Sequence, residues 1–418
     1  MPAKGYATEL EEIVAERSVL ICCGSGGVGK TTTSAAIALA AAMSGRRTCV
    51  VTIDPARRLA NALGIEGLTN TPKQIAIGTP APASTPRERP VDVRVEAGRS
   101  ASEVGGELWA MMLDTKATFD DLVRRYAGSS EQVERILANR IYKELSSALS
   151  GTQEYMAMEK LYELVEEGGY DLVVVDTPPT RNALDFLEAP SRLIRFLEHR
   201  LFRLVLMPTR MYLRAVSVAT QAFVRTVSKV AGAEILDDAV TFFQAFDGME
   251  EGFHARADRM DSLMRDPDTA FVLVTTPRPE AIDEAGWFTN RLDQYGIEIQ
   301  ALVANRVHPV FLPAGTDVTI DDLNGVADRL EARDAAGAKT ATGADTKREG
   351  DWAARMEAAA LIRNLSNYEL VARRDQKAVS ALGSRMSPSS VTSVPLLTED
   401  VHDLQGLHRL AGLLAPGC

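Results

Sequence analysis

The chain has 418 residues, of which 45% are hydrophobic and 25% charged. This composition is ordinary for a globular protein with a sizeable core, and it excludes a chain that is disordered throughout. The 46 basic residues stand against 57 acidic ones, which gives a net charge of −11. That sign disfavours broad nucleic-acid binding, because such binding needs a cationic surface that displaces counterions.

Cysteine usage and hydropathy exclude further classes of protein. Four cysteines occur, at positions 22, 23, 49 and 418, with no Cys-x-x-Cys pair. A disulfide framework and a thiolate zinc site are therefore disfavoured. Residues 1–20 are polar and acidic and lack the apolar core of a secretion signal. No stretch reaches the roughly 18 apolar residues that cross a bilayer, so we expect a cytoplasmic protein.

The first predicted elements alternate between strand and helix. Residues 18–23 (SVLICC) form an apolar run typical of a buried strand and lead into a glycine-rich stretch. A helix of small residues follows and ends at Gly45, a residue typical of a helix C-terminal cap. Residues 48–53 (TCVVTI) predict a second buried strand. This order of elements predicts a mostly parallel α/β sheet flanked by helices.

Further strands are predicted downstream, with long helical stretches between them. Residues 108–113 (LWAMML) are ambiguous, because their length also suits the start of a helix. The other predicted strands are 172–175, 270–274, 301–304 and 391–394, and the helical stretches are 115–149, 153–167 and 191–265. These helical stretches exceed a simple crossover helix, so we expect a helical subdomain inserted into the sheet domain.

Two segments of low hydrophobicity are expected to lie outside the core. Residues 71–90 carry five prolines and few large apolar groups, and we expect a flexible insertion over 71–107. Residues 331–351 contain no aliphatic side chain larger than alanine, which is typical of a solvated linker or an exposed helix. The expected boundaries place the sheet domain at 1–114, 168–190 and 267–418, and the helical subdomain at 115–167 and 191–266.

Residues 24–31 match the phosphate-loop pattern G-x-x-x-x-G-K-[ST] at every position. Glycines let backbone N–H groups turn toward phosphate oxygens, and the following helix adds its positive N-terminus. Lys30 would bridge the β- and γ-phosphates, the Thr31 hydroxyl would ligate Mg²⁺, and Thr32 would hold the α-phosphate. A chance glycine-rich turn is the alternative, which the flanking strand and helix disfavour. The other residues expected in the cradle are Gly26, Gly27, Val28 and Gly29.

Two carboxylates follow predicted strands and would reach the same edge of the sheet. Asp176 ends the strand at 172–175, as a Walker B carboxylate does, and would ligate Mg²⁺. A strand-end aspartate that caps a turn is the alternative. Asp54 ends the strand at 48–53 and would orient the water that attacks the γ-phosphate, or cap a helix before Pro55, and the two roles are compatible. We expect a Mg²⁺-dependent ATPase with Lys30, Asp54 and Asp176 as its catalytic residues.

Three motifs together carry a family resemblance: GSGGVGKTT at the loop, TIDPARRLANALG after the second strand, and VVVDTPPTRNALDFLEAP around Asp176. They resemble the ArsA family of arsenite-pump ATPases and ATPases that target tail-anchored proteins. VANRVHP and VPLLTEDVHDLQGL resemble the family's adenine-contacting segments. The resemblance implies a P-loop NTPase fold that binds ATP and Mg²⁺. It also implies switch I at DPARR, switch II at DTPPTRNAL, an adenine contact from Asn305, and packing of Pro395 and Leu396 on the base.

The resemblance also implies partners. In the family, two subunits face each other across their nucleotides, and hydrolysis moves their helical subdomains. A second ATPase subunit is therefore expected, in a homodimer or in a heterodimer with a paralogue. A membrane-protein client or a transporter is the expected target of the helical subdomain.

The chain departs from the family at several positions. Family loops usually carry a lysine where this chain has Ser25, and that lysine reaches the partner's phosphates. Its loss implies slow hydrolysis, a paralogous partner that supplies the lysine, or a substitute cation such as Arg57, Arg58 or Arg181. Switch II has Arg181-Asn182 where the family usually has Gly-His. The metalloid-binding cysteines of arsenite pumps have no counterparts, which disfavours an arsenite sensor.

The segment 191–229 is basic inside an acidic chain, with eight arginines or lysines against one glutamate. Leucines and arginines recur on two largely opposite helical faces, as in helices that contact an anionic membrane surface or an acidic partner. An ordinary amphipathic helix is the alternative, and we prefer it. Methionines at 207, 211, 249, 260 and 264 suit an apolar client groove or core packing, of which core packing is preferred.

The sequence thus predicts a Mg²⁺-dependent ATPase whose nucleotide state repositions a helical subdomain that acts on a membrane-protein client or a transporter. Two alternatives from other classes stay open. One is a nucleotide-binding interaction subunit with little turnover that pairs with an active paralogue. The other is a ParA-like positioning ATPase, against which the net negative charge argues where DNA is the support.

Overall fold

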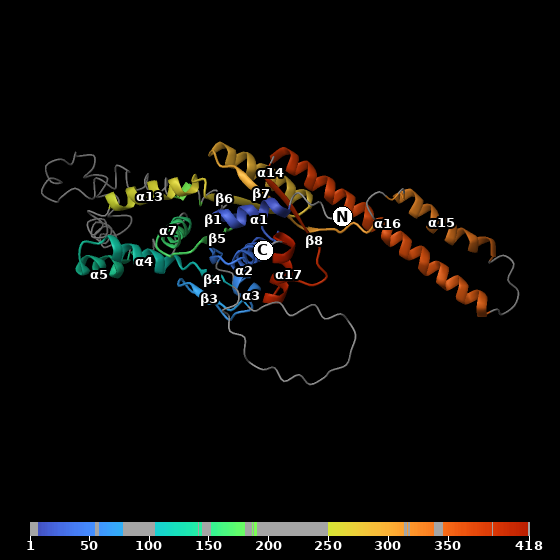
Figure 1. The fold of residues 1–418 in the computed structure, drawn as a ribbon, viewed down its shortest axis with the longest axis horizontal. Coiled ribbons are helices and arrows are strands. Elements are labelled where there is room, and N and C mark those ends of the chain that lie inside the picture. Colours follow the sequence, from blue (N-terminus) through green and yellow to red (C-terminus); the bar gives the residue numbers. More distant parts are fainter. Residues whose placement is uncertain are drawn as a thin grey trace, which may run out of the picture.

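The computed structural model describes residues 7–54, 58–77, 105–140, 142–143, 152–179, 186, 188–189, 250–312, 316, 318–337, 346–386 and 388–416. Within these residues the chain forms one central sheet of eight strands with helices on both of its faces (Figure 1). None of the helices in this part of the chain is long and apolar enough to span a bilayer.

The strands lie in the order β3-β4-β2-β5-β1-β6-β7-β8. Every neighbouring pair is parallel except the edge pair β3–β4, which is antiparallel. The carboxyl ends of the seven parallel strands therefore meet at one edge of the sheet. The strands are β1 Val19–Cys23, β2 Arg47–Thr52, β3 Lys73–Ile75, β4 Glu107–Met112, β5 Leu172–Asp176, β6 Thr269–Thr275, β7 Ile299–Val307 and β8 Ser390–Pro395.

The central strands β1 and β5 are buried along their whole length because both faces of the sheet are covered. Successive side chains of β1 and β5 enter two separate core clusters, as the two-residue period of a strand requires. Ile21 and Val175 belong to one cluster, and Leu20 and Val174 belong to the other. All five residues of each of these two strands are buried.

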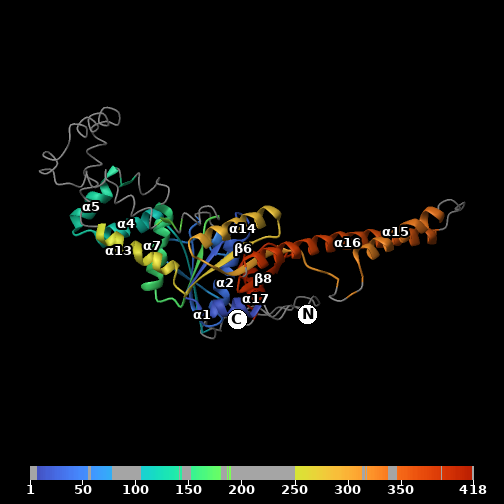
Figure 2. The ribbon, with the colours of Figure 1, turned by 90° about the horizontal axis from the view of Figure 1, so that it is seen from above.

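Helices complete the two core clusters. On one face the helices that contribute buried residues include α1 Ala7–Glu16, α2 Lys30–Met43, α3 Arg58–Ala62 and α17 Leu404–Leu414. On the other face they include α4 Thr115–Tyr126, α5 Ser130–Ala138, α7 Thr152–Glu166, α13 Glu250–Met264 and α14 Pro279–Gln294. The described helices α4, α5, α7 and α13 gather at one end of the molecule, and we call them the helical region (Figure 2).

A helical hairpin extends from the opposite end of the molecule (Figure 2). It consists of α15 Ile320–Gly337 and of α16 Thr346–Met386, whose 41 residues span about 60 Å at 1.5 Å per residue. Arg363 of α16 pairs with Asp328 and Glu331 of α15, at 2.7 Å each. The last part of α16 returns to the sheet, where Val379 packs on β7.

The fold class expected from the sequence, a mostly parallel α/β sheet of the P-loop type with flanking helices, is confirmed. Residues 108–112 of the ambiguous segment 108–113 belong to strand β4, so this segment is a strand and not the start of a helix. The segment 331–351 was expected to be a solvated linker or an exposed helix. Its two ends are helical, because they belong to α15 and α16, and residues 338–345 lie outside the described residues.

The insertion expected over 71–107 differs from the structure at both of its ends. Lys73–Ile75 pairs with β4 as the antiparallel edge strand, and Glu107 is already part of β4. A three-residue edge strand has too short a hydrophobic pattern to be recognised in the sequence. Residues 78–104 lie outside the described residues, as do 180–184 of switch II and the basic segment 191–229 with its methionines at 207 and 211.

Candidate nucleotide site

The phosphate loop connects β1 to α2, and its backbone requires glycine at three positions. Gly24, Gly27 and Gly29 have φ angles of 150°, 79° and 97°, in the region that side chains rarely adopt. A Cβ atom at Gly24 would collide with the carbonyl oxygen of Val274, and one at Gly29 would collide with the Asn305 amide. The loop is therefore packed too closely against β6 and β7 to accept a larger residue at either end.

Lys30 is the first residue of α2, and its ammonium group closes the loop. Its Nζ atom donates a hydrogen bond of 2.9 Å to the carbonyl oxygen of Ser25. The side chain is only 8% exposed, and burial lowers its pKa, although the nearby Asp176 carboxylate acts in the opposite direction. A buried cation held by one backbone carbonyl is able to turn to a stronger anionic acceptor inside the same loop.

Asp176 ends β5 at the centre of the carboxyl edge and accepts two hydrogen bonds on one oxygen. Thr31 Oγ1 donates to Asp176 Oδ2 at 2.7 Å, and Thr52 Oγ1 donates to the same atom at 2.8 Å. The carboxyl group is 1% exposed. Burial raises its pKa to about 6, against the two hydroxyl groups, which lower it.

This arrangement fits a Mg²⁺–ATP complex. Asp176 Oδ1 is buried and has no hydrogen-bond partner in the described part of the chain. An unpartnered buried carboxylate oxygen beside a threonine hydroxyl is a donor set of the type that Mg²⁺ uses together with phosphate oxygens and water. The residues that would hold the metal are Thr31 and Asp176, and Lys30 with the backbone of residues 26–29 would hold the phosphates.

Asp54 follows β2 at the same edge. Its side chain is 24% exposed, and its Oδ2 atom lies 3.7 Å from Arg58 Nη1. The Asp54 N–H donates to Thr52 Oγ1 at 3.3 Å, so Asp54 is joined to Asp176 through Thr52. Of the three arginines considered as substitute cations, Arg58 thus lies beside Asp54, while Arg57 and Arg181 fall outside the described residues.

The residues assigned to the adenine side end the next strands of the sheet. Asn305 Nδ2 donates to the carbonyl oxygen of Val28 at 2.8 Å and so contacts the phosphate loop from β7. Pro395 pairs with Val307, and the Leu396 N–H donates to the Val307 carbonyl at 2.8 Å. Leu396 is 40% exposed, which leaves its side chain available to a planar ligand. Thr32 is half-buried in the first turn of α2.

Arg306 is a site residue that the sequence did not suggest. It is the one non-glycine residue with a positive φ, 61°, in the described part of the chain. Ala304 pairs with Ser393 and Val307 pairs with Pro395, so β7 carries one extra residue there, as in a β-bulge. Arg306 Nη1 lies 3.4 Å from the Gly27 carbonyl oxygen. The bulge therefore lets two consecutive side chains, those of 305 and 306, contact the same loop.

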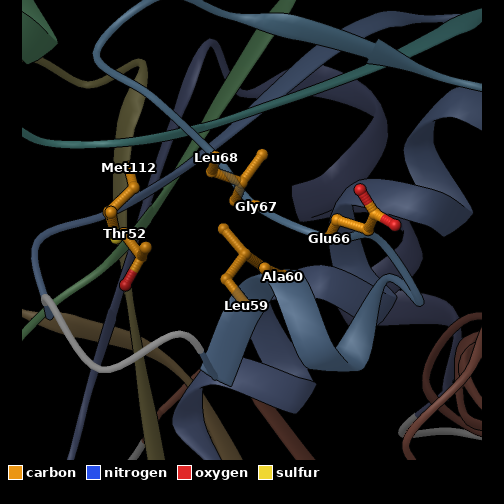
Figure 3. Close-up of a pocket in the computed structure, with 7 residues that line it drawn as sticks. All are labelled: Thr52, Leu59, Ala60, Glu66, Gly67, Leu68 and Met112. Carbon is orange, nitrogen blue, oxygen red and sulfur yellow. The ribbon is translucent and has the colours of Figure 1, made fainter.

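Two cavities border the site. One has a volume of about 500 Å³ and lies against the phosphate loop, and Ser25 lines it together with Arg278, Glu280, Glu284 and Arg306. Cationic groups are thus present near the position at which the family lysine is missing. The other has a volume of about 400 Å³, lies beside Thr52 and is largely apolar (Figure 3), lined by Thr52, Leu59, Ala60, Glu66, Gly67, Leu68 and Met112.

The phosphate loop opens a helix, and the threonine that follows its lysine contacts a buried carboxylate at a strand end. Together these features define a P-loop NTPase. The chain belongs to the anion-transporting ATPase (ArsA) family, whose profile matches residues 17–312. It is accordingly an ATPase that binds ATP together with Mg²⁺. The matched part ends before the hairpin α15–α16.

Individual relatives agree with this assignment. The ATPase GET3 of Malassezia globosa is 26% identical over 73% of this chain and 78% of its own length. The putative arsenical pump-driving ATPase 1 of Aquifex aeolicus is 23% identical over 95% of this chain and 78% of its own. The ATPase GET3B of Arabidopsis thaliana is 27% identical over 74% of this chain and 69% of its own length.

Proposed function

We propose that the chain hydrolyses ATP with Lys30, Thr31, Asp54 and Asp176, and that its nucleotide state moves the helical region. The contact of Thr31 and Thr52 with Asp176, which leaves one buried carboxylate oxygen free, carries the first part of the proposal. The proposed movement of the helical region is supported by α7, which belongs to that region and is hydrogen-bonded to the Ile53 carbonyl beside Asp54.

The chemistry follows from these positions. When bound, Mg²⁺ and ATP supply a triphosphate whose developing charge the metal neutralises. Lys30 would give up its hydrogen bond to the Ser25 carbonyl and donate to phosphate oxygens instead. Asp176 Oδ1, which has no hydrogen-bond partner in the described part of the chain, would then help to hold the metal. Asp54 is partly exposed at the same edge, and in this proposal its carboxylate would orient a water molecule and accept its proton.

Asp54→Asn tests the catalytic assignment. The amide keeps the shape of the side chain but is a far weaker proton acceptor, so we expect the steady-state rate of phosphate release to fall by about 100-fold. The Kd for Mg²⁺–ATP, measured by calorimetry, is expected to stay within about two-fold, because the phosphate loop and Asp176 are untouched.

Asp283→Asn on α14 is the matched control, since it removes one negative charge from an exposed position outside the site. It is expected to keep the parent rate. An Asp54→Asn protein that releases phosphate as fast as the parent would show that another group orients the water. A parent protein with negligible turnover would instead favour the interaction-subunit alternative, which the uncharged Ser25 supports.

We infer further that the chain works as a dimer and acts on a membrane-protein client or a transporter. The family resemblance and the name of the Aquifex aeolicus relative, an arsenical pump-driving ATPase, support this inference. Light scattering of the Asp54→Asn protein tests the dimer: a doubled mass with Mg²⁺–ATP is expected, and a monomer mass under saturating nucleotide would contradict it. Cosedimentation with anionic vesicles tests contact with a membrane surface, which salt should weaken.

A further inference from the structure

Helix α7 begins directly beside the strand end that carries Asp54. Gln153 is the second residue of this helix, and its Nε2 atom donates a hydrogen bond of 3.0 Å to the carbonyl oxygen of Ile53. The two residues are 100 positions apart in the sequence. The bond therefore exists only because the helical region packs against the carboxyl edge of the sheet.

The bond fixes the peptide group from which Asp54 projects. The Ile53 carbonyl and the Asp54 N–H belong to the same planar peptide unit. Gln153 donates to the carbonyl oxygen of this unit, and the N–H of the unit donates to Thr52 Oγ1 at 3.3 Å. Rotation of this unit would break one or both bonds, so the direction of the Asp54 side chain depends on Gln153 as well as on Thr52.

The same segment is tied to the metal-binding strand. The Ile53 N–H donates to the Asp176 carbonyl oxygen at 3.1 Å, and the Thr52 hydroxyl donates to the Asp176 carboxylate. Both of these connections come from within the sheet, where β2 and β5 are paired neighbours. The hydrogen bond from Gln153 instead comes from the helical region.

A buried ion pair joins α7 to α13. Glu159 of α7 and Arg256 of α13 lie 2.6 Å apart, with side chains 3% and 7% exposed. The Arg256 guanidinium also lies 4.1 Å from the ring centre of Tyr162 on α7. Separating the two helices would leave both charges buried and unpaired, which is costly, so a displacement of α13 carries Gln153 with it.

We propose that Gln153 is a positioning residue for ATP hydrolysis, which holds the Ile53–Asp54 peptide and so makes the placement of the Asp54 carboxylate depend on the position of α7. The proposal rests on the role proposed above for Asp54. A hydrogen bond of 3.0 Å weakens steeply when its partners separate by an ångström. A partner that shifts the helical region by that distance would therefore change the rate of hydrolysis without touching the nucleotide.

Gln153→Met and Gln153→Glu test the proposal. Methionine matches glutamine in length and in helix propensity but donates no hydrogen bond. Glutamate keeps the shape, lacks the donor at neutral pH, and is favourable in the first turn of a helix, so loss of activity with this variant does not come from a weakened α7. Both variants are expected to lower kcat by about ten-fold, the rate equivalent of one hydrogen bond. Their Kd for Mg²⁺–ATP is expected to match that of the parent.

Two further variants complete the test. Gln376→Met is the matched control, because Gln376 is also a helical glutamine, in α16, and is exposed. It is expected to keep the parent kcat. Gln153→Lys, which restores a donor on a flexible side chain, is expected to recover most of the rate lost in Gln153→Met.

The double variant Asp54→Asn, Gln153→Met separates the two proposals. If Gln153 acts through Asp54, the second change lowers kcat no further than Asp54→Asn alone. A parent kcat in Gln153→Met, an equal loss of kcat and of nucleotide affinity, or full additivity in the double variant would each overturn the positioning role. None of these results bears on Asp54 itself, whose assignment fails only if Asp54→Asn by itself retains the parent rate.

Discussion

Replacement of Asp176 by asparagine is expected to stabilise the nucleotide-free protein at neutral pH. Burial raises the pKa of this carboxyl from 3.8 to about 6 in the folded chain. A tenfold change in proton affinity is worth about 1.4 kcal/mol, so holding the charged form in the folded state costs about 3 kcal/mol. The asparagine oxygen still accepts from Thr31 and Thr52, so the neutral variant avoids this cost and keeps both hydrogen bonds.

The stability that Asp176→Asn gains over the parent is expected to increase with pH. Between pH 3.8 and about 6 the folded state binds more protons at Asp176 than the unfolded state, so the stability of the parent falls as the pH rises. The cost is complete above about pH 6 and absent below pH 3.8. The free energy of unfolding of Asp176→Asn is therefore expected to exceed that of the parent by about 3 kcal/mol at pH 8 and by a small fraction of this at pH 4.

Urea unfolding followed by tryptophan fluorescence, with and without Mg²⁺–ATP, measures these differences. Mg²⁺–ATP should reverse the order, because a ligand that needs the carboxylate stabilises the parent and not the variant. Asp283→Asn again serves as the control for a change of charge and is expected to shift stability by less than about 0.5 kcal/mol. An Asp176→Asn protein that is less stable than the parent at pH 8 without nucleotide would refute the reasoning that burial of the charged Asp176 carboxylate destabilises the nucleotide-free fold.

Two other substitutions test the loop and the helical region. Gly29→Ala puts a Cβ against Asn305 at a φ of 97°, and we expect the Kd for ATP to rise about 30-fold, the equivalent of about 2 kcal/mol of strain. Gly45→Ala, at a φ of 101° with open space around its Cβ, is the control and should keep the parent Kd in calorimetry. Arg256→Met leaves Glu159 buried without its partner and should lower the free energy of unfolding by about 3–5 kcal/mol, whereas a double change of both residues to methionine should restore much of it. A loss below 1 kcal/mol in urea unfolding of the single variant would mean that water reaches Glu159.

The phosphate site was largely predictable because its determinants are local. The loop, Lys30 and Thr31 lie within eight consecutive residues, and their chemistry follows from residue type and spacing. Asp176 and Asp54 were predictable because each directly follows an apolar run, and parallel strands bring their carboxyl ends to one edge. The strand at 108–113 stayed ambiguous, since a short apolar run has the same pattern in a buried strand and in a buried helix.

Contacts between distant residues were decided by the tertiary structure alone. Thr52 contacts Asp176 because β2 and β5 are neighbours, an order that the sequence does not state. The left-handed Arg306 results from a bulge in the pairing of β7 with β8, which no residue type marks. Gln153 is one glutamine among several on predicted helices, and only the packing of α7 places it on Ile53.

The amino-acid sequence by itself determined the class of chemistry, since a phosphate loop and its two carboxylates depend on the conformations that single residues and short runs prefer. The tertiary structure decided which additional side chains reach that chemistry. A hydrogen bond between residues about 100 positions apart forms only after the sheet order and the helix packing are set, because its geometry tolerates errors of no more than a few tenths of an ångström.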